Sequence, residues 1–334
     1  MATIYDVARR AEVSPATVSR VVNGHANVDP TLAERVRRAM RELEYRPNAV
    51  ARNLRRSRTT LWAVIISDIG NPFFTSLVRG VEDVAQRAGF SVVLCNTDED
   101  PTKESQYLDA ALTEQMAGVI ISPSGRANHV NRLVDARVPV VVIDRQVSGA
   151  HVDTVLVDNE HGASLATTHL IESGYERIAC ITGPEGVFTA MRRLRGYRRA
   201  LEDHDREYDP DLVRHGDFRS DGGYRAMASL LALRPRPDAI FAGNNLMTVG
   251  AVECLVDSRI EVPAEMGVVG FDDVPWAHLV RPSLTTVAQP TYELGREAAQ
   301  LLTQRIATPD RPPTVITLET KLQIRDSSLP RSQP

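Results

Sequence analysis

Short apolar runs alternate with longer amphipathic segments between residues 61 and 271, and this alternation constrains the fold more than any other feature. Strands separated by helices predict parallel sheets that carry helices on both faces. We predict strands at 61–67, 90–96, 118–123, 139–144, 177–183, 239–243 and 267–271, with helices that include 72–89, 103–115 and 161–173. Ligands of such sheets bind beyond the carboxyl ends of the strands. We therefore expect a binding site among the loops 68–74, 144–145, 183–193, 243–247 and 271–276.

The charges of the chain divide unevenly between its first 60 residues and the rest. Residues 1–60 contain 12 arginines and 6 acidic residues, whereas the remainder contains 27 basic and 37 acidic residues. A basic head on an acidic body indicates that the head alone meets a polyanion. A solvated basic face would give the same count, so the residue pattern of the head has to distinguish the two interpretations.

Three short helices are predicted in the head. The first covers 4–11, and Thr3 precedes it as a residue that can cap its free N–H groups. Ser14 caps the second helix, which opens on Pro15, and the third opens on Pro30. Three short helices around a core of valine, alanine and leucine predict a helix-turn-helix domain. The alternative is a generic three-helix domain that contacts another protein.

The start of the second helix carries the predicted DNA contacts. In a helix-turn-helix domain the outward residues at this place face the major groove. Arg20 can offer two donors to O6 and N7 of guanine, which is the commonest specific base contact. Short polar side chains nearby suit phosphates, which position the protein without specifying sequence. The predicted contacts in the head are Thr3, Ser14, Pro15, Ala16, Thr17, Ser19, Arg20 and Asn23.

A hinge segment, residues 47–58, follows the head. Val50 and Leu54 would share one face of a short helix that has no obvious local core and is surrounded by arginines. A helix of this length is marginal in water, so it suits a segment that folds when it docks in the minor groove. The alternative is a plain basic linker. The predicted DNA contacts here are Asn48, Arg52, Leu54 and Arg55.

The head and the hinge resemble the lac-repressor (LacI/GalR) family in three blocks, 3–8, 14–23 and 46–54, which keep the family's order and spacing. The resemblance implies a homodimer that binds double-stranded, near-palindromic operator DNA. It also implies that Leu54 inserts between bases at the operator centre when two hinge helices pair.

The body resembles the same family in the blocks 71–74, 142–145, 157–159, 270–273, 284–287 and 324–328. The resemblance implies an N-terminal all-α head joined to an α/β body of two doubly wound parallel-sheet lobes, of the periplasmic-binding-protein type. The expected divisions are the head at 1–46, the hinge helix and linker at 47–58, a first lobe at 60–160 with 291–320, and a second lobe at 161–289 with 322–328.

The family's effector contacts, carried over position by position, give a set of cleft residues. The resemblance implies contacts from Phe73, Phe74, Asp144, Thr189, Arg193, Phe218, Asn244 and Asp272. Carboxylates accept hydrogen bonds, amides and guanidinium groups donate them, and phenyl faces stack on sugars or bases. The expected effector is a sugar, a nucleoside or a related metabolite. The alternatives are that the two adjacent phenylalanines belong to the core and that the aspartates cap turns.

Two residues depart from the family pattern. Met191 stands where sugar-binding members usually carry arginine, and its loss removes a bidentate donor for hydroxyl groups. A plain sugar effector is therefore in doubt, and nucleobase or nucleoside effectors stay open. Asn245 stands where aspartate is usual, so a charge is replaced by a neutral amide at a place that bears on the coupling between the lobes.

Other functions leave few signs in the sequence. A solute-binding protein on the same body fold would need a secretion signal, which the start of the chain lacks, and we expect a cytoplasmic protein with no membrane segment. An enzyme is the other alternative, but no phosphate loop, nucleophile elbow or paired His-Glu metal motif is present. Cys95, Cys180 and Cys254 are far apart, so we expect buried thiols and no metal or cofactor. The sequence predicts a non-enzymatic transcription regulator, most often a repressor in this family.

Overall fold

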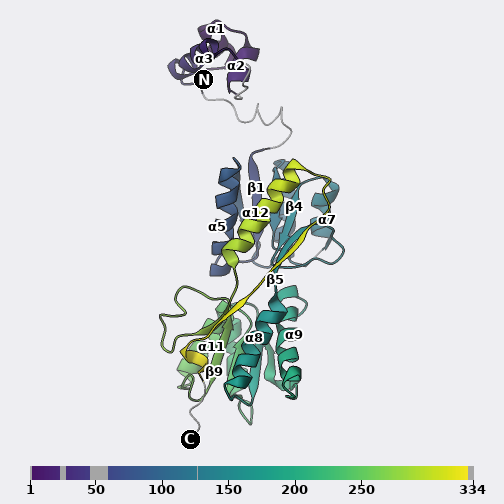
Figure 1. Ribbon diagram of the computed structural model, residues 1–334, viewed down its shortest axis with the longest axis vertical. Helices are drawn as coiled ribbons and strands as arrows, with labels where there is room; N and C mark the ends of the chain where they lie inside the picture. Colours follow the sequence, from purple (N-terminus) through teal and green to yellow (C-terminus); the bar gives the residue numbers. More distant parts are fainter. Residues whose placement is uncertain (1, 23–27, 46–58, 126, 330–334) are drawn as a thin grey trace. The chain divides into compact units, whose positions relative to one another are not determined.

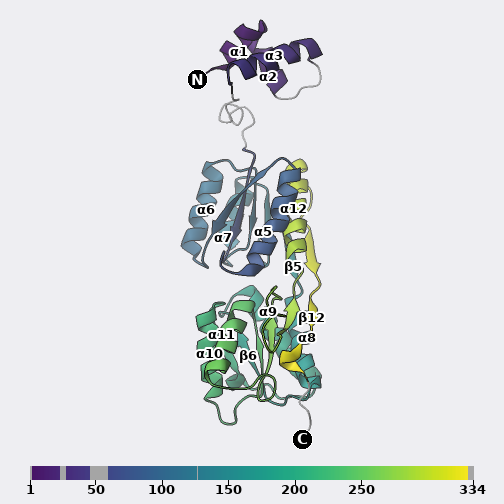
Figure 2. The same cartoon turned by 90° about the vertical axis from the view of Figure 1, so that its left-hand side faces the viewer.

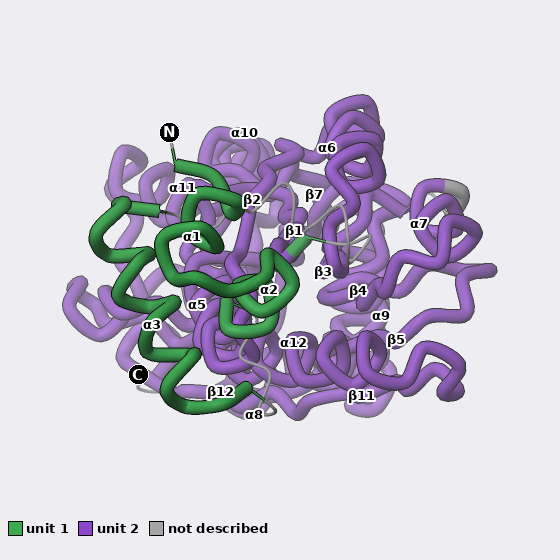
Figure 3. Tube along the Cα trace, turned by 90° about the horizontal axis from the view of Figure 1, so that it is seen from above, with its two compact units in different colours: residues 1–59 green, residues 60–334 purple. Residues whose placement is uncertain are grey.

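The structure is a computed structural model that describes residues 2–22, 28–45, 59–125 and 127–329. The chain divides into two compact units, residues 1–59 and 60–334, which Figure 3 colours separately. Five of the predicted DNA contacts lie outside the described residues: Asn23, Asn48, Arg52, Leu54 and Arg55.

The first unit contains the three predicted helices, α1 (Ile4–Ala11), α2 (Pro15–Val22) and α3 (Pro30–Glu42). Thr3 and Asp6 cap α1 reciprocally, because each side chain bonds to the other residue's backbone N–H. Ser14 Oγ accepts from the N–H of Thr17 at 3.1 Å and so caps α2. The buried core of this unit consists of Val7, Ala8, Ala11, Val18, Val36 and Ala39. The predicted helix-turn-helix layout is confirmed.

The second unit has two lobes, each a six-stranded sheet between two pairs of helices (Figure 2). The first lobe has the strand order β11-β5-β4-β3-β1-β2, and all its strands are parallel. Its strands are β1 (Leu61–Ile66), β2 (Ser91–Asn96), β3 (Gly118–Ile121), β4 (Val140–Ile143), β5 (Asp153–Val157) and β11 (Val315–Leu318). Helices α5 (Pro72–Arg87) and α12 (Thr291–Ala307) cover one face, and α6 (Pro101–Thr113) and α7 (Ala127–Asp135) cover the other.

The second lobe repeats this architecture with the order β12-β10-β9-β8-β6-β7. Its strands are β6 (Ile178–Thr182), β7 (Val213–His215), β8 (Ala239–Ala242), β9 (Gly267–Phe271), β10 (Thr285–Ala288) and β12 (Lys321–Gln323). Helices α8 (Asn159–Glu172) and α9 (Phe188–Asp203) cover one face, and α10 (Ser220–Leu231) and α11 (Asn245–Asp257) cover the other. Short 3-10 turns occur at Pro210–Leu212 and Asp326–Ser328. Only β12 is antiparallel to its neighbour in the described part of the chain.

The predicted fold class is confirmed, and all seven predicted strands are present within two residues of their expected ends. Five further strands, β5, β7, β10, β11 and β12, were not predicted. All five occupy or adjoin the edge of a sheet, where they complete the two lobes.

The chain crosses between the lobes three times, after β5, after β10 and after β11 (Figure 1). The first and third crossings are hydrogen-bonded to each other. The N–H of Asp158 donates to the carbonyl of Leu318 at 2.9 Å, and the Thr320 hydroxyl donates to the carbonyl of Asp158 at 3.4 Å. The lobes are therefore joined along one side and meet each other at the carboxyl ends of their strands.

Helices α5 and α12 pack against each other without an intervening side chain. A methyl group at Gly80 would lie 2.2 Å from the carbonyl oxygen of Tyr292, and one at Gly295 would lie 1.9 Å from that of Leu77. Both distances are far below van der Waals contact, so only glycine permits this approach. The close packing fixes α12, which starts at the second crossing, against α5, which starts at the cleft.

Candidate functional site

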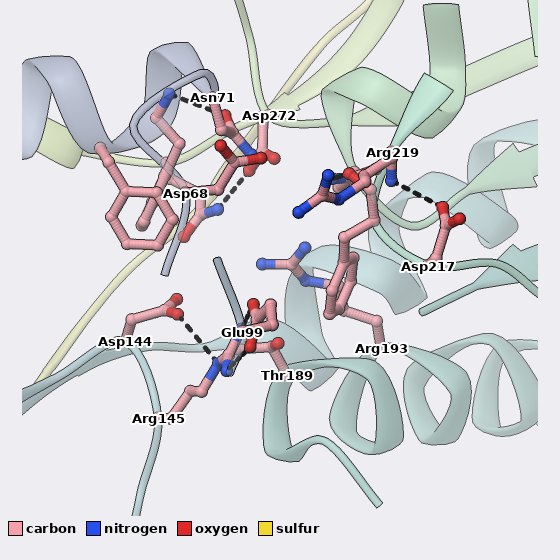
Figure 4. A pocket seen from close by; sticks show the side chains of 15 residues that line it. Asp68, Asn71, Glu99, Asp144, Arg145, Thr189, Arg193, Asp217, Arg219 and Asp272 are labelled. Carbon is pink, nitrogen blue, oxygen red and sulfur yellow. Dashed lines mark hydrogen bonds and ion pairs between the residues drawn. The ribbon is translucent and has the colours of Figure 1, made fainter. Parts of the chain in front are cut away.

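One cavity between the two lobes contains about 500 Å³ of empty space, counting the part open to solvent. All eight residues predicted to contact an effector line it: Phe73, Phe74, Asp144, Thr189, Arg193, Phe218, Asn244 and Asp272. The structure adds seven further lining residues, Asp68, Asn71, Glu99, Arg145, Asp217, Arg219 and Gln289. Nearly all of them follow the carboxyl end of a strand, which is where parallel sheets place their ligands. Figure 4 shows side chains of both lobes turned toward this space.

Three phenyl rings supply the apolar part of the cavity wall. Phe73 and Phe74 meet edge to face, with ring centroids 4.9 Å apart, and both are more than nine-tenths buried. These two residues therefore belong to the core of the first lobe and line the cavity at once. Phe218 lies in the second lobe with φ at 63°, a region that bulky residues rarely adopt. Its ring packs directly on Gly183, where any side chain would collide with it.

Arg193 is one of two buried cations that line the cavity, the other being Arg145. Its Nε donates to Asn159 Oδ1 at 2.7 Å, and its Nη1 donates to the carbonyl of Gly243 at 2.6 Å. The guanidinium plane lies over the Phe271 ring at 3.8 Å from the centroid. Burial lowers the pKa of Arg193, and the nearby carboxylates of Asp272 and Asp144 act in the opposite direction. The second terminal nitrogen of Arg193, Nη2, forms no hydrogen bond with the described residues. Nη2 is therefore available to a ligand.

Asp144 and Asp272 approach this arginine from opposite lobes, each with a positive φ, 65° and 76°. Burial raises the pKa of Asp144, while Arg145 and Arg193 counteract the rise. Ser122 donates to Asp144 Oδ2 at 3.2 Å. The carboxylate of Asp272 accepts from the N–H of Asn245 at 3.3 Å and from the Gln289 amide. Both side chains are thus held in place before any ligand enters, as a preorganised site requires.

Two polar residues at helix starts complete the predicted set. Asn244 caps α11, because its Oδ1 accepts from the N–H of Met247 at 2.8 Å, and its Nδ2 donates to the carbonyl of Phe218 at 2.9 Å. Thr189 lies in the first turn of α9 and is buried. Asn244 therefore ties the strained Phe218 loop to the start of α11.

Arg145 differs from the adjacent Asp144 because its terminal nitrogens are paired within the first lobe. Both of its terminal nitrogens bind the two carboxylate oxygens of Glu99, and Nη1 also reaches the carbonyl of Pro123. Bidentate pairing of this kind neutralises both charges and fixes their geometry. The pair forms a rigid floor of the cavity between the loops that follow β2 and β4.

An amide pair joins the lobes directly. Asn245 Nδ2 donates to Asn71 Oδ1 at 2.9 Å, and both side chains are more than nine-tenths buried. The same Asn71 oxygen accepts from the N–H of Phe73 and so caps α5. The departure at position 245 therefore lies where the first turns of α5 and α11 face each other, and it supplies a donor to an oxygen that already accepts one bond.

The other departure lies away from the cavity. Met191 is 50% exposed and does not line the space that holds the eight predicted residues. Its side chain leaves the cavity donors unchanged, so this position gives no structural ground against a sugar. The doubt raised by the sequence is not supported by the placement of the residue.

All the described head residues predicted to contact DNA except Thr3 lie on α2 or directly before it. Ser14, Pro15, Ala16 and Arg20 are exposed, and Thr17 and Ser19 are half-buried. Arg20 makes no hydrogen bond or ion pair with the described residues, whereas Ser14 and Thr17 bond to each other through their hydroxyls at 3.0 Å. Thr3 is exposed but is engaged in the cap of α1. The arrangement leaves Arg20 as the long donor on this surface.

Other kinds of site are not evident in the described residues. No helix there has the length and apolarity to span a membrane. No group of histidine, cysteine and acidic side chains in the same residues is arranged to hold a metal ion. All three cysteines are buried and free.

Two family descriptions match the chain. Residues 3–48 match "Bacterial regulatory proteins, lacI family", and residues 167–328 match "Periplasmic binding protein-like domain". The catabolite control protein A of Priestia megaterium is 37% identical over 328 residues, which are 98% of this chain and 99% of that protein.

Solved structures resemble the chain over its whole length. The transcriptional regulator CelR in complex with cellobiose has a TM-score of 0.75 and 37% identity, and the match covers 98% of this chain and all of that one. The lac repressor dimer bound to operator and the anti-inducer ONPF has a TM-score of 0.87 and 29% identity, covering 98% and 99%.

Asn245→Asp is expected to weaken the contact between the lobes. A carboxylate there would face Oδ1 of Asn71 without a donor between them, which costs about 1–3 kcal/mol of unfolding free energy. Denaturation of the full chain measures the loss. In an Asn71→Ala background most of this loss of unfolding free energy should disappear. The control substitution Asn131→Asp on α7 should change the unfolding free energy little. An equal loss in both backgrounds would contradict the coupling.

Proposed function

The chain belongs to the lacI family of bacterial regulatory proteins, and from that premise we propose that it is a sequence-specific repressor whose hold on operator DNA depends on a small molecule in the inter-lobe cavity. The observation that carries the proposal is the combination of two sites in one chain. The head has an exposed Arg20 on a helix-turn-helix, with no hydrogen bond or ion pair to the residues that the structure describes, and the body has a preorganised polar cavity.

The head separates this function from the alternatives. A solute-binding protein shares the body fold but has no use for a helix-turn-helix domain. The relatives named above are regulators rather than enzymes, and we propose that this chain also has no catalytic activity. In the cavity Arg193 donates to the carbonyl of Gly243 and Asp272 accepts from the N–H of Asn245, and such fixed hydrogen bonds serve binding rather than proton transfer.

The proposed effector is a small metabolite that carries hydroxyl groups. Phenyl rings offer an apolar face to a sugar or a base, and the free Nη2 of Arg193 can donate to a hydroxyl oxygen. A ligand that contacts Asp144 of the first lobe and Asp272 of the second binds best when the lobes are closed. Such a ligand shifts the equilibrium between lobe arrangements, and operator DNA must shift ligand affinity by the same factor.

A dimer is proposed to read a near-palindromic operator, since two heads on a two-fold axis match two half-sites. The second lobe carries an apolar groove that suits contact with a second copy. The groove is lined by apolar residues that include Val252, Val256, Trp276 and Val280. Val256 is 69% exposed, and Leu279, the chain neighbour of Val280, is 65% exposed. Exposed apolar groups that cluster in this way mark contact surfaces.

Arg20→Ala is expected to cost about 1–3 kcal/mol of binding free energy on the selected operator and to relax the preference at one base position in each half-site. The operator is first selected from a random DNA pool with the full-length protein, and affinities are then compared on operator variants. Arg38→Ala removes the same charge from α3 and should weaken all sequences alike. A loss for Arg20→Ala that is equal on every sequence would rule out base readout.

Leu279→Asp is expected to dissociate the dimer, because a carboxylate would have to be buried in the apolar contact. Sedimentation should then show a monomer at micromolar concentration, with weaker operator binding. Val134→Asp on α7 places the same charge at another exposed apolar position and should leave the dimer intact. If Leu279→Asp remains dimeric, the copies meet through a different surface.

Asp272→Asn is expected to abolish the response of operator binding to any metabolite that shifts it in the wild type. Asparagine tolerates the positive φ, but its amide nitrogen would oppose one of the two donors that Asp272 now accepts, from Asn245 or Gln289. The assay is operator titration with cellobiose, ribose and nucleosides as first probes. Operator binding without metabolite should persist, which separates a lost response from a lost fold. Normal ligand affinity in the variant would place the effector elsewhere.

A further inference from the structure

The carboxylates of the cavity are already engaged by the protein. Both oxygens of Glu99 bind Arg145, and Asp217 accepts from the N–H of Arg219 and from Arg225. Asp272 accepts two bonds, as described above. Asp144 accepts from Ser122 and Asp68 accepts from the N–H of Gly70. Each acidic group that lines the cavity therefore has at least one donor before a ligand arrives.

The three lining arginines differ in this respect. Both terminal nitrogens of Arg145 donate to Glu99. Two of the three guanidinium nitrogens of Arg193 donate to Asn159 and Gly243. The guanidinium of Arg219 forms no hydrogen bond or ion pair with any described residue, although it lines the cavity and is exposed. In Figure 4 the side chains of Arg193 and Arg219 both extend from the second lobe into the same space.

The backbone that carries Arg219 is held in a fixed position. Asp217 Oδ1 accepts its N–H at 3.0 Å and packs so closely on Gly222 that a methyl group there would lie 2.0 Å away. The preceding residue, Phe218, keeps its positive φ because Asn244 bonds to its carbonyl. A strained loop that the surroundings hold in place is characteristic of functional positions. Arg219 is thus presented to the cavity rather than left on a loose loop.

We propose that Arg219 holds a carboxylate of the effector, so that the cavity selects a hydroxylated monocarboxylic acid, such as a sugar acid, over the corresponding neutral sugar. This inference rests on the proposed function, because it assigns the chemistry of the ligand in the same cavity. A guanidinium with all its donors free matches a carboxylate in a bidentate geometry. The free Nη2 of Arg193 serves a neighbouring hydroxyl oxygen of the same ligand.

The balance of charges favours a monoanion over a phosphate. Five carboxylates and three guanidinium groups line the cavity, so a dianion meets more repulsion than a carboxylate does. Asp98, on the opposite lobe, also feels the charge of Arg219, but its strongest partner is Lys103. The competing role for Arg219 is a mouth latch, meaning an ion pair with Asp98 across the opening of the cavity. Such an ion pair would affect the affinity of every ligand alike.

The test compares matched pairs of ligands on the full-length protein by calorimetry. The pairs are D-glucose with D-glucuronate, D-galactose with D-galacturonate, D-ribose with D-ribonate, and cellobiose with cellobionate. In at least one pair the acid should bind about 10- to 100-fold more tightly than the neutral sugar. Raising the salt concentration to about 1 M should reduce this preference and leave the neutral sugar unaffected.

Arg219→Gln should remove the preference by weakening the acid alone, and Arg219→Lys should keep part of it, because the charge remains without the planar fork. Arg225→Gln is the matched control. It makes the same change on the far side of Asp217, outside the cavity, and should keep the preference.

The proposal is overturned if the neutral member binds as well as the acid in every pair, or if none of the acids binds. It is also overturned if Arg219→Gln weakens both members equally, which is the result that a mouth latch gives. Even then, the proposed regulatory function would stand if operator binding responded to a neutral metabolite. The regulatory function itself would be contradicted if the wild-type protein showed no selective operator binding.

Discussion

The cleft is built around a buried cation, Arg193. A guanidinium that leaves water unpaired costs several kcal/mol, so the surroundings of Arg193 have to supply hydrogen-bond acceptors and opposite charges. They come from parts of the chain far apart in sequence: Asn159 just after the first crossing, the carbonyl of Gly243 at the end of β8, and the charges of Asp144 and Asp272. The arginine is therefore satisfied only when the crossing, the second sheet and the first lobe are all in place.

Much of the fold could be predicted because most of its strands are buried on both faces. Central strands of a parallel sheet are continuous apolar runs, and those of 61–67, 118–123 and 139–144 are visible without any tertiary information. β5 was missed although all its residues are buried, because it opens on Asp153. Arg305 and Arg311 neutralise that carboxylate from more than 150 residues away, and local sequence cannot report such a pairing.

The edge strands were missed for a different reason. β7, β11 and β12 have three or four residues each and are partly exposed, so their strand state depends on the neighbours with which they pair. This failure extends to the candidate site, because Asp217 and Arg219 follow β7. The eight cleft residues came from family positions. The Asn71–Asn245 contact, between residues 174 positions apart, is visible only in the arrangement of the two lobes in the structure.

The three crossings also decide when the molecule can assemble during its synthesis. β11 completes the first sheet beside β5 and comes from residues 315–318, so neither lobe is a continuous stretch of chain. The head has a core of its own within residues 7–39 and belongs to a compact unit that ends before the two lobes begin. Domains fold as units while the chain emerges from the ribosome, N-terminal ones first. A nascent or truncated copy therefore has a folded DNA-binding head before its cleft is complete. Such copies cannot be controlled by an effector.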